Sequence, residues 1–250
     1  MIPCYVIHLG DDFQNRESLE DFGLNPIGFK GVDARKDEHL KYSENVDILC
    51  QYTCPKSTIG CALSHILLAQ KLYDEGVQVA LVLEDDAYPK VPRIDVHEIL
   101  ENIPSDWEII KLHCIPYCNE SIHVDVTEAS NAAYLINRKG MDKVRKLKAR
   151  MHIDFHYNIS NVKMYKYKNI FMTDESTSNI RESQKPHWFS YFIPTPTSGE
   201  QKREHIFMYK IFRIPGTNVE VTTGRLVDIL CVVLIGFLIH KILDFRKIKM

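Results

Sequence analysis

The feature that most constrains this fold is an apolar run that ends in three acids, at residues 79–86 (VALVLEDD). Five consecutive aliphatic residues are typical of a strand buried on both faces of a sheet. Ligands of open α/β sheets gather at the carboxyl ends of the strands, so Glu84, Asp85 and Asp86 stand where a ligand is expected. Three adjacent carboxylates repel one another, and a hard cation such as Mg²⁺ or Mn²⁺ would offset that repulsion. A solvated acidic turn is the alternative that the local pattern leaves open.

Strands and helices alternate along the chain, which predicts an α/β fold with a mostly parallel sheet. The clearest helix begins at Ser57, ends at Gly76 and leads directly into the acid-tipped strand. A period of 3.6 residues places Cys61 and His65 on its apolar side, where both are expected to fill the core. Residues 36–56 show no period and are expected to form a long surface loop. Further strands are expected at residues 3–9, 27–32, 107–112 and 132–136, and further helices at residues 16–22, 96–102 and 138–150.

Seven cysteines are an odd number, so at least one thiol is unpaired within a monomer. The pairs Cys50/Cys54 and Cys114/Cys118 have a C-x₃-C spacing that zinc sites also use, but neither lies in the context of a zinc ribbon. Reduced or locally bridged thiols are therefore expected.

The segment that follows the expected helix at 138–150 carries a second group of possible metal ligands. His152, Asp154 and His156 alternate, and a period of two would place all three on one face of a strand. This signal is less specific than the three acids, because no second cluster accompanies it.

Charge gives no indication of a nucleic-acid partner. The formal net charge is −2, which offers no attraction for a polyanion. Seven Lys or Arg residues lie within residues 138–150, and a charge run of this kind is usually a solvated helix face.

The C-terminal region changes character after a proline-containing stretch. Residues 229–239 are apolar throughout apart from Gly236, and the surrounding stretch of about 18 residues reaches the lower limit for crossing a bilayer. We expect a single-pass membrane anchor here, with a buried terminal helix as the alternative. Basic residues after it favour a cytosolic C-terminus, whereas the lack of a visible signal peptide favours late insertion of a tail anchor, so both orientations stay open.

Four sequence blocks, in chain order, resemble glycosyltransferase family 25, which includes lipooligosaccharide galactosyltransferases and collagen galactosyltransferase domains. The specific block is residues 59–65 (IGCALSH) leading to residues 81–86 (LVLEDD). The other blocks are residues 5–9 with Arg16, residues 29–35, and residues 133–136 followed by Asp154 and residues 176–180. The resemblance spans residues 3–182. It implies a catalytic domain at 1–183. The residues beyond it lie outside the resemblance, and composition and hydropathy divide them into a linker at 184–224, a transmembrane helix at 225–245 and a basic tail at 246–250.

The resemblance implies a GT-A-like nucleotide-sugar-binding fold, a UDP-sugar donor, Mn²⁺ or Mg²⁺ and an inverting transfer. Glu84, Asp85 and Asp86 take the place of the fold's acidic metal motif, with Glu84 and Asp86 facing the metal and the diphosphate. His65 thereby changes from an expected core residue to an expected site residue. The residues implied around the donor are His8, Arg16, Asp33, Arg35, Ser64 and His65.

The chemistry expected of such an enzyme is the transfer of a hexose, galactose or glucose, to a hydroxyl of a glycan, glycolipid or protein acceptor. A hydroxyl is a poor nucleophile at neutral pH and needs a positioned base. Asp154 is the first candidate for that base, because it follows a strand-like segment and matches a family aspartate. Asp106 is the second candidate.

Two departures from the family pattern keep other functions open. Thr58 stands where the family has a glutamate, and Gly10-Asp11 replaces an Asp-Arg pair. A catalytically silent, membrane-anchored binding partner is one alternative, although three retained acids count against it. A metal-dependent phosphohydrolase is the other, but it would need a second acidic cluster.

Overall fold

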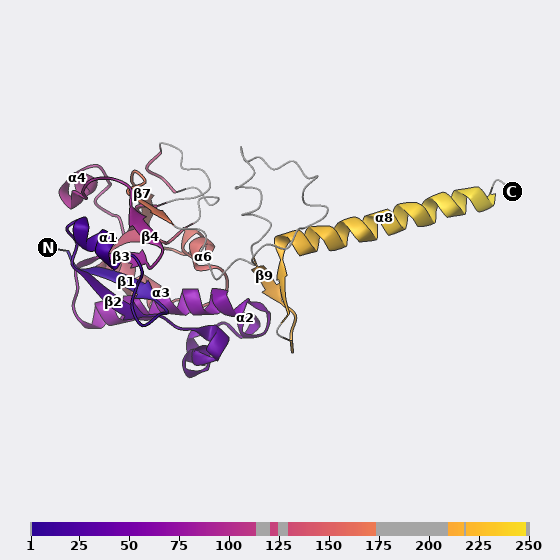
Figure 1. Ribbon diagram of the computed structural model, residues 1–250, viewed down its shortest axis with the longest axis horizontal. Coiled ribbons are helices and arrows are strands. Elements are labelled where there is room, and N and C mark those ends of the chain that lie inside the picture. Colours follow the sequence, from indigo (N-terminus) through magenta and orange to yellow (C-terminus); the bar gives the residue numbers. More distant parts are fainter. Residues whose placement is uncertain (1, 114–120, 125–129, 174–209, 218, 249–250) are drawn as a thin grey trace. The chain divides into compact units, whose positions relative to one another are not determined.

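The computed structural model describes residues 2–113, 121–124, 130–173, 210–217 and 219–248, which are drawn as coloured ribbons in Figure 1. The chain divides into two compact units, residues 1–178 and 179–250. The domain boundary expected at residue 183 lies outside the described residues and stays a prediction.

Six strands form one sheet in the first unit, in the order β2-β1-β3-β6-β5-β7. Neighbouring strands are parallel except at β6, which runs antiparallel to both β3 and β5. The carboxyl ends of five strands therefore share one sheet edge with the start of β6, and the expected α/β class with a mostly parallel sheet is confirmed. The strands are β1 (Cys4–His8), β2 (Pro26–Lys30), β3 (Val79–Glu84), β5 (Ile109–Lys111), β6 (Ala133–Asn137) and β7 (Met164–Lys166).

Helices cover both faces of this sheet, which explains the unbroken apolar run in β3. Ala80 and Val82 lie in the core on one face, whereas Leu81 and Leu83 lie in the core on the other. In Figure 1 the long helix α3 runs below the strands, and α1 and α4 lie above them. The first face carries α3 (Lys56–Asp74), α5 (Arg138–Val144) and α6 (Ile153–Ile159), and the second carries α1 (Arg16–Asp21) and α4 (Val96–Glu101).

The expected surface loop at residues 36–56 is instead a series of short helices. These are the 3₁₀ helices η1 (Ala34–Lys36) and η2 (Glu38–Asn45), followed by α2 (Ile48–Thr53). The Asp47 carboxylate caps α2 by accepting a hydrogen bond from the Leu49 amide. A disulfide joins Cys50, inside the helix, to Cys54, its C-cap residue. The polar residues of this stretch follow no apolar period, so the sequence pattern did not indicate these helices.

The segment after α5 also differs from expectation. The helix expected to reach residue 150 ends at Val144, and residues 153–159 form helix α6 rather than a strand. His152 is the N-cap residue of α6, and Asp154 lies in its first turn. The alternation of His152, Asp154 and His156 therefore does not place them on one strand face. After the three acids, β4 (Ala87–Pro89) pairs with β8 (Phe171–Thr173) in a separate antiparallel ladder.

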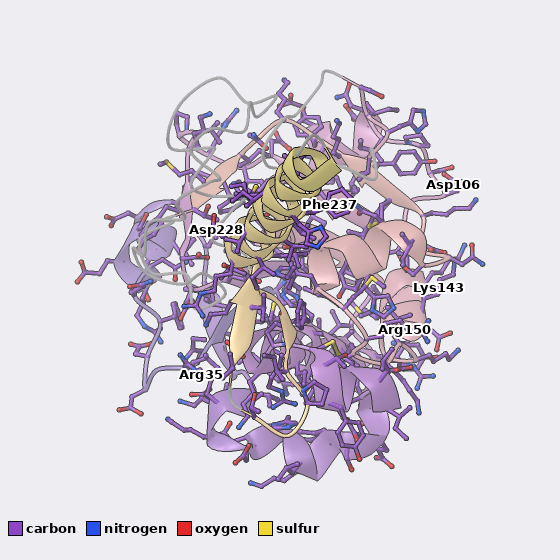
Figure 2. The ribbon with its side chains drawn as sticks, turned by 90° about the vertical axis from the view of Figure 1, so that its right-hand side faces the viewer. Arg35, Asp106, Lys143, Arg150, Asp228 and Phe237 are labelled. Atoms are coloured by element: carbon purple, nitrogen blue, oxygen red, sulfur yellow. A yellow bond between two sulfur atoms is a disulfide. The ribbon has the colours of Figure 1, made fainter. Side chains whose placement is uncertain are left out.

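The second unit contains a hairpin and a long helix. Strands β9 (Lys210–Arg213) and β10 (Glu220–Thr222) are antiparallel and lead into α8 (Thr223–Ile248). Part of the expected linker is thus a hairpin, and its residues up to 209 lie outside the described part of the chain. Residues 223–240 of α8 are long and apolar enough to cross a membrane, with a mean hydropathy of 1.9, and few of them are buried. Figure 2 labels Asp228 and Phe237 on this helix.

Candidate functional site

The three acids at the end of β3 face two different parts of the protein, helix α3 and the end of β1. Glu84 and Asp86 both act electrostatically on Cys61 of α3, so they belong to the α3 side of the sheet. Asp85 instead faces the end of β1, where the charge of His8 and the Leu9 amide act on its carboxylate. Burial, followed by the charge of Glu84, nevertheless raises the pKa of Asp85. The acids are therefore a Glu84/Asp86 pair and a separate Asp85, with Glu84 at the end of β3 and the two aspartates in the turn before β4.

A chain of hydrogen bonds joins Glu84 to helix α3. His65 Nε2 lies 3.0 Å from Glu84 Oε1, and His65 Nδ1 lies 2.8 Å from Tyr134 Oη. Each ring nitrogen of His65 therefore has a hydrogen-bonding partner, the Glu84 carboxylate at Nε2 and the Tyr134 hydroxyl at Nδ1. Burial raises the pKa of Tyr134 well above its ordinary value, which keeps its hydroxyl protonated. His65 is only 1% exposed, while Glu84 is 29% exposed at the sheet edge.

Cys61 lies one helical turn before His65 and reaches the same carboxylate. Its Sγ is 3.8 Å from Glu84 Oε1. Burial, with the charges of Glu84, Asp154 and Asp86, raises the pKa of this thiol well above its ordinary value. One ligand atom from each of Cys61, His65 and Glu84 lies within 4.8 Å of the other two.

Asp154 and Lys111 lie on the same side of the sheet as this cluster. Asp154 Oδ1 accepts a 2.7 Å hydrogen bond from the Asn131 amide, and His152 Nδ1 lies 3.1 Å from Oδ2. Burial alone would raise the pKa of Asp154, but His152 and the charges of Lys111 and His65 lower it to about 2. Lys111 is fully buried, and its Nζ lies 3.2 Å from Asn158 Oδ1.

Two of the expected donor-site residues lie close to the ends of β1 and β2. His8 ends β1, and its Nδ1 lies 3.2 Å from the Gly10 carbonyl. Asp33 follows β2, and its carboxylate accepts two hydrogen bonds from the Arg35 guanidinium, at 2.8 and 3.0 Å. This guanidinium lowers the pKa of Asp33 despite partial burial. Both positions are at the sheet edge that carries Glu84.

Arg16 and Ser64, also expected at the donor site, have partners within the protein. Arg16 pairs with Asp12 and covers the Phe13 ring at 4.1 Å. Ser64 is buried, donates a hydrogen bond to the Gly60 carbonyl and accepts one from the Val32 amide. In this arrangement Ser64 joins α3 to the segment after β2.

Asp106, the second candidate base, lies at the opposite edge of the sheet. It precedes β5, so it is near the amino ends of the parallel strands, and its carboxylate pairs with Lys163 and Tyr165 on the protein surface. Figure 2 shows Asp106 far from Arg35, which lies beside the expected donor site. This geometry separates Asp106 from Glu84.

Sequence reasoning did not identify Tyr134 or Lys111 as site residues, and it assigned Cys61 to the core. The i, i+4 spacing of Cys61 and His65 was a signal that both side chains share one helix face. No sequence pattern indicated that Tyr134 would contact His65, because Tyr134 lies in an apolar strand 69 residues away in sequence.

Comparison with known proteins gives one family match. Residues 1–115 match the sequence model of glycosyltransferase family 25, described as an LPS biosynthesis protein. The crystal structure of A197 from STIV is similar at 11% identity and a TM-score of 0.39, covering 68% of this chain and 83% of that chain. A glycosyltransferase involved in the glycosylation of the major capsid of PBCV-1 is similar at 8% identity and a TM-score of 0.38, covering 67% and 81%. Both TM-scores are too low to carry an argument about the site, and no curated protein matches the sequence.

Proposed function

We propose, from the premise that the protein is a glycosyltransferase whose residues 1–115 match family 25, that it transfers a hexose from a UDP-sugar to an acceptor hydroxyl. The observation that carries this proposal is the Glu84/Asp86 pair at the sheet edge where ligands of α/β folds bind. The acceptor class is a glycan, a glycolipid or a protein side chain, and galactose and glucose are the sugars to test first.

The donor set at this edge fits a hard divalent cation such as Mn²⁺ or Mg²⁺. Glu84 and Asp86 offer carboxylate oxygens, which such cations prefer, and Asp85, which is directed at the end of β1, adds negative charge beside them. A bound cation would stabilise the charge that develops on the leaving diphosphate. The protein's own contribution is to hold Glu84 in one orientation through His65 and Tyr134, so that its carboxylate does not have to reorganise when the donor binds.

Asp154 is our proposed general base. Its pKa of about 2 keeps it ionised at neutral pH, which is the state that a base requires. The same low pKa weakens its affinity for a proton, so we expect a rate contribution at the lower end of the range of about 10²–10⁴. Asp106 is not part of the proposal, because it lies at the opposite sheet edge.

We further propose that α8 anchors the protein in a membrane. The support is its length and the exposure of its apolar side chains within the second unit. Leu230, Val233 and Phe237 are each more than half exposed there, which a helix in water would not favour.

Donor turnover by the full chain in detergent tests this function. UDP-galactose, UDP-glucose and UDP-N-acetylhexosamines would each be supplied with Mn²⁺ and with a chelator. We expect metal-dependent turnover of one donor, lost in a Glu84→Ala/Asp86→Ala variant and retained in Asp106→Asn, the matched control at the opposite edge. If the double variant turned over the donor as fast as the parent protein, the assignment of the acids would be overturned.

A further inference from the structure

The cluster of Cys61, His65 and Glu84 contains a combination of ligands that a hard cation does not need. A thiol, an imidazole and a carboxylate are the ligand types of zinc sites, whereas Mn²⁺ and Mg²⁺ prefer oxygen. The three come from two elements that pack directly on one another, helix α3 and strand β3. We propose that Cys61, His65 and Glu84 form a binding site for Zn²⁺ or a similar soft divalent cation.

The spacing of the ligand atoms supports this site. Ligands at zinc-bond lengths in a tetrahedral site are separated from one another by about 3.3 to 3.6 Å. The His65 Nε2 to Glu84 Oε1 distance is 3.0 Å, and the Cys61 Sγ to Glu84 Oε1 distance is 3.8 Å. These two separations bracket the tetrahedral range, and all three ligand atoms lie within 4.8 Å of one another, so small side-chain shifts would bring them to three-ligand coordination with a fourth position left for water or substrate.

The surroundings of the cluster also suit a cation. The Tyr134 hydroxyl holds His65 Nδ1 at 2.8 Å, which leaves Nε2 directed at Glu84. With Nε2 bound to a cation, Nδ1 would carry the proton and donate it to the Tyr134 hydroxyl oxygen, as zinc-binding histidines usually do with the second ring nitrogen. Asp86 and Asp154 add negative charge near Cys61 without belonging to the ligand set. The i, i+4 spacing on α3 presents Cys61 and His65 together, as paired ligands on a helix require.

Occupancy by zinc would compete with the transferase reaction, an effect that rests on the proposed function. Glu84 is shared by the two sites, so a soft cation would hold its carboxylate against α3. We expect micromolar Zn²⁺ to inhibit turnover and excess Mn²⁺ to relieve the inhibition only in part. The binding itself is independent of catalysis and is measured without any donor.

Cobalt is the probe, because Co²⁺ replaces Zn²⁺ and absorbs strongly when a thiolate is bound to it. The full chain would carry Cys114→Ser and Cys118→Ser, so that this second cysteine pair cannot contribute, and no reductant would be added, so that the Cys50–Cys54 bridge stays closed. We expect a thiolate-to-cobalt charge-transfer band and tetrahedral visible bands at one equivalent of Co²⁺, both displaced by Zn²⁺.

Variants separate this site from other thiols. Cys61→Ser should abolish the charge-transfer band, while Cys231→Ser, which removes a thiol of the second unit, should leave it intact. Tyr134→Phe should keep the band but weaken zinc binding by about 10- to 100-fold. A band that persists in Cys61→Ser, or no band at all in the folded parent, would overturn the proposal. Circular dichroism of each variant would establish that the fold is retained.

Discussion

His65 Nε2 and Glu84 Oε1 lie 3.0 Å apart, so a helix residue assigned to the core by its period is a direct partner of the acidic motif. The contact joins α3 to the carboxyl end of β3, and Tyr134 extends it to β6. Three elements of the first unit thus determine the orientation of one carboxylate.

Replacing Tyr134 by phenylalanine tests this chain of hydrogen bonds. The variant leaves His65 Nδ1 buried without its 2.8 Å partner, which should lower the free energy of unfolding by about 1–3 kcal/mol. Turnover should fall more than donor affinity, because the orientation of Glu84 is relaxed. Denaturant unfolding and steady-state kinetics measure the two effects. Unchanged values for both would mean that the hydroxyl has no role in the site.

Replacing Asp154 by asparagine tests the proposed base. Turnover should fall by about 10²-fold with donor binding intact, since the amide cannot accept a proton. Donor affinity from calorimetry and rates from single-turnover kinetics separate the two properties. Near-normal turnover would remove Asp154 from the catalytic assignment.

The same carboxylate should make stability depend on pH. The pKa of Asp154 is about 2 in the folded protein against 3.8 for an ordinary aspartate, so the ionised form is stabilised by folding. This contribution, about 2 kcal/mol, should be present above pH 4 and disappear as the pH falls towards 2. Denaturant titrations from pH 6 to pH 2 would detect it as a loss of stability that is smaller in Asp154→Asn. Parallel curves for the two proteins would contradict the expectation.

Gly60 is required for the close packing of α3. A Cβ at this position would lie 2.5 Å from the Val32 carbonyl oxygen and 3.2 Å from the Ala34 amide nitrogen. Gly60→Ala should therefore cost about 1–2 kcal/mol of stability, even after the better helix propensity of alanine is counted. Gly236→Ala, in a helix where nothing lies within 4 Å of the added Cβ, is the matched control and should cost nothing.

A charge in the middle of α8 should prevent membrane insertion. Each arginine at the centre of a transmembrane helix costs about 2.5–3.5 kcal/mol. Val233→Arg/Leu234→Arg should therefore move the full chain from the membrane fraction to the soluble or aggregated fraction. Val233→Ala/Leu234→Ala should stay with the membrane after alkaline extraction. A soluble parent protein would contradict the anchor.

The sequence alone determined the features that depend on local pattern. The apolar run in β3, the helix before it and the acids after it predicted an α/β sheet with a ligand at its carboxyl edge, because strand and helix periods are set by neighbouring residues. The family match over residues 1–115 agrees with blocks that the sequence itself presents. Helices α2 and α6 were missed because their residues showed no apolar period that indicates a helix, whereas α1 and α4, which are similarly short, were expected.

Tertiary structure alone decided which of these residues meet. Asp85 is directed at the end of β1, whereas Glu84 contacts His65 because α3 packs on one face of the sheet. Asp106 lies at the far edge because β5 runs in the same direction as β3. Each of these outcomes depends on strand order and helix packing, which bring together residues far apart in sequence, and no local pattern encodes such contacts.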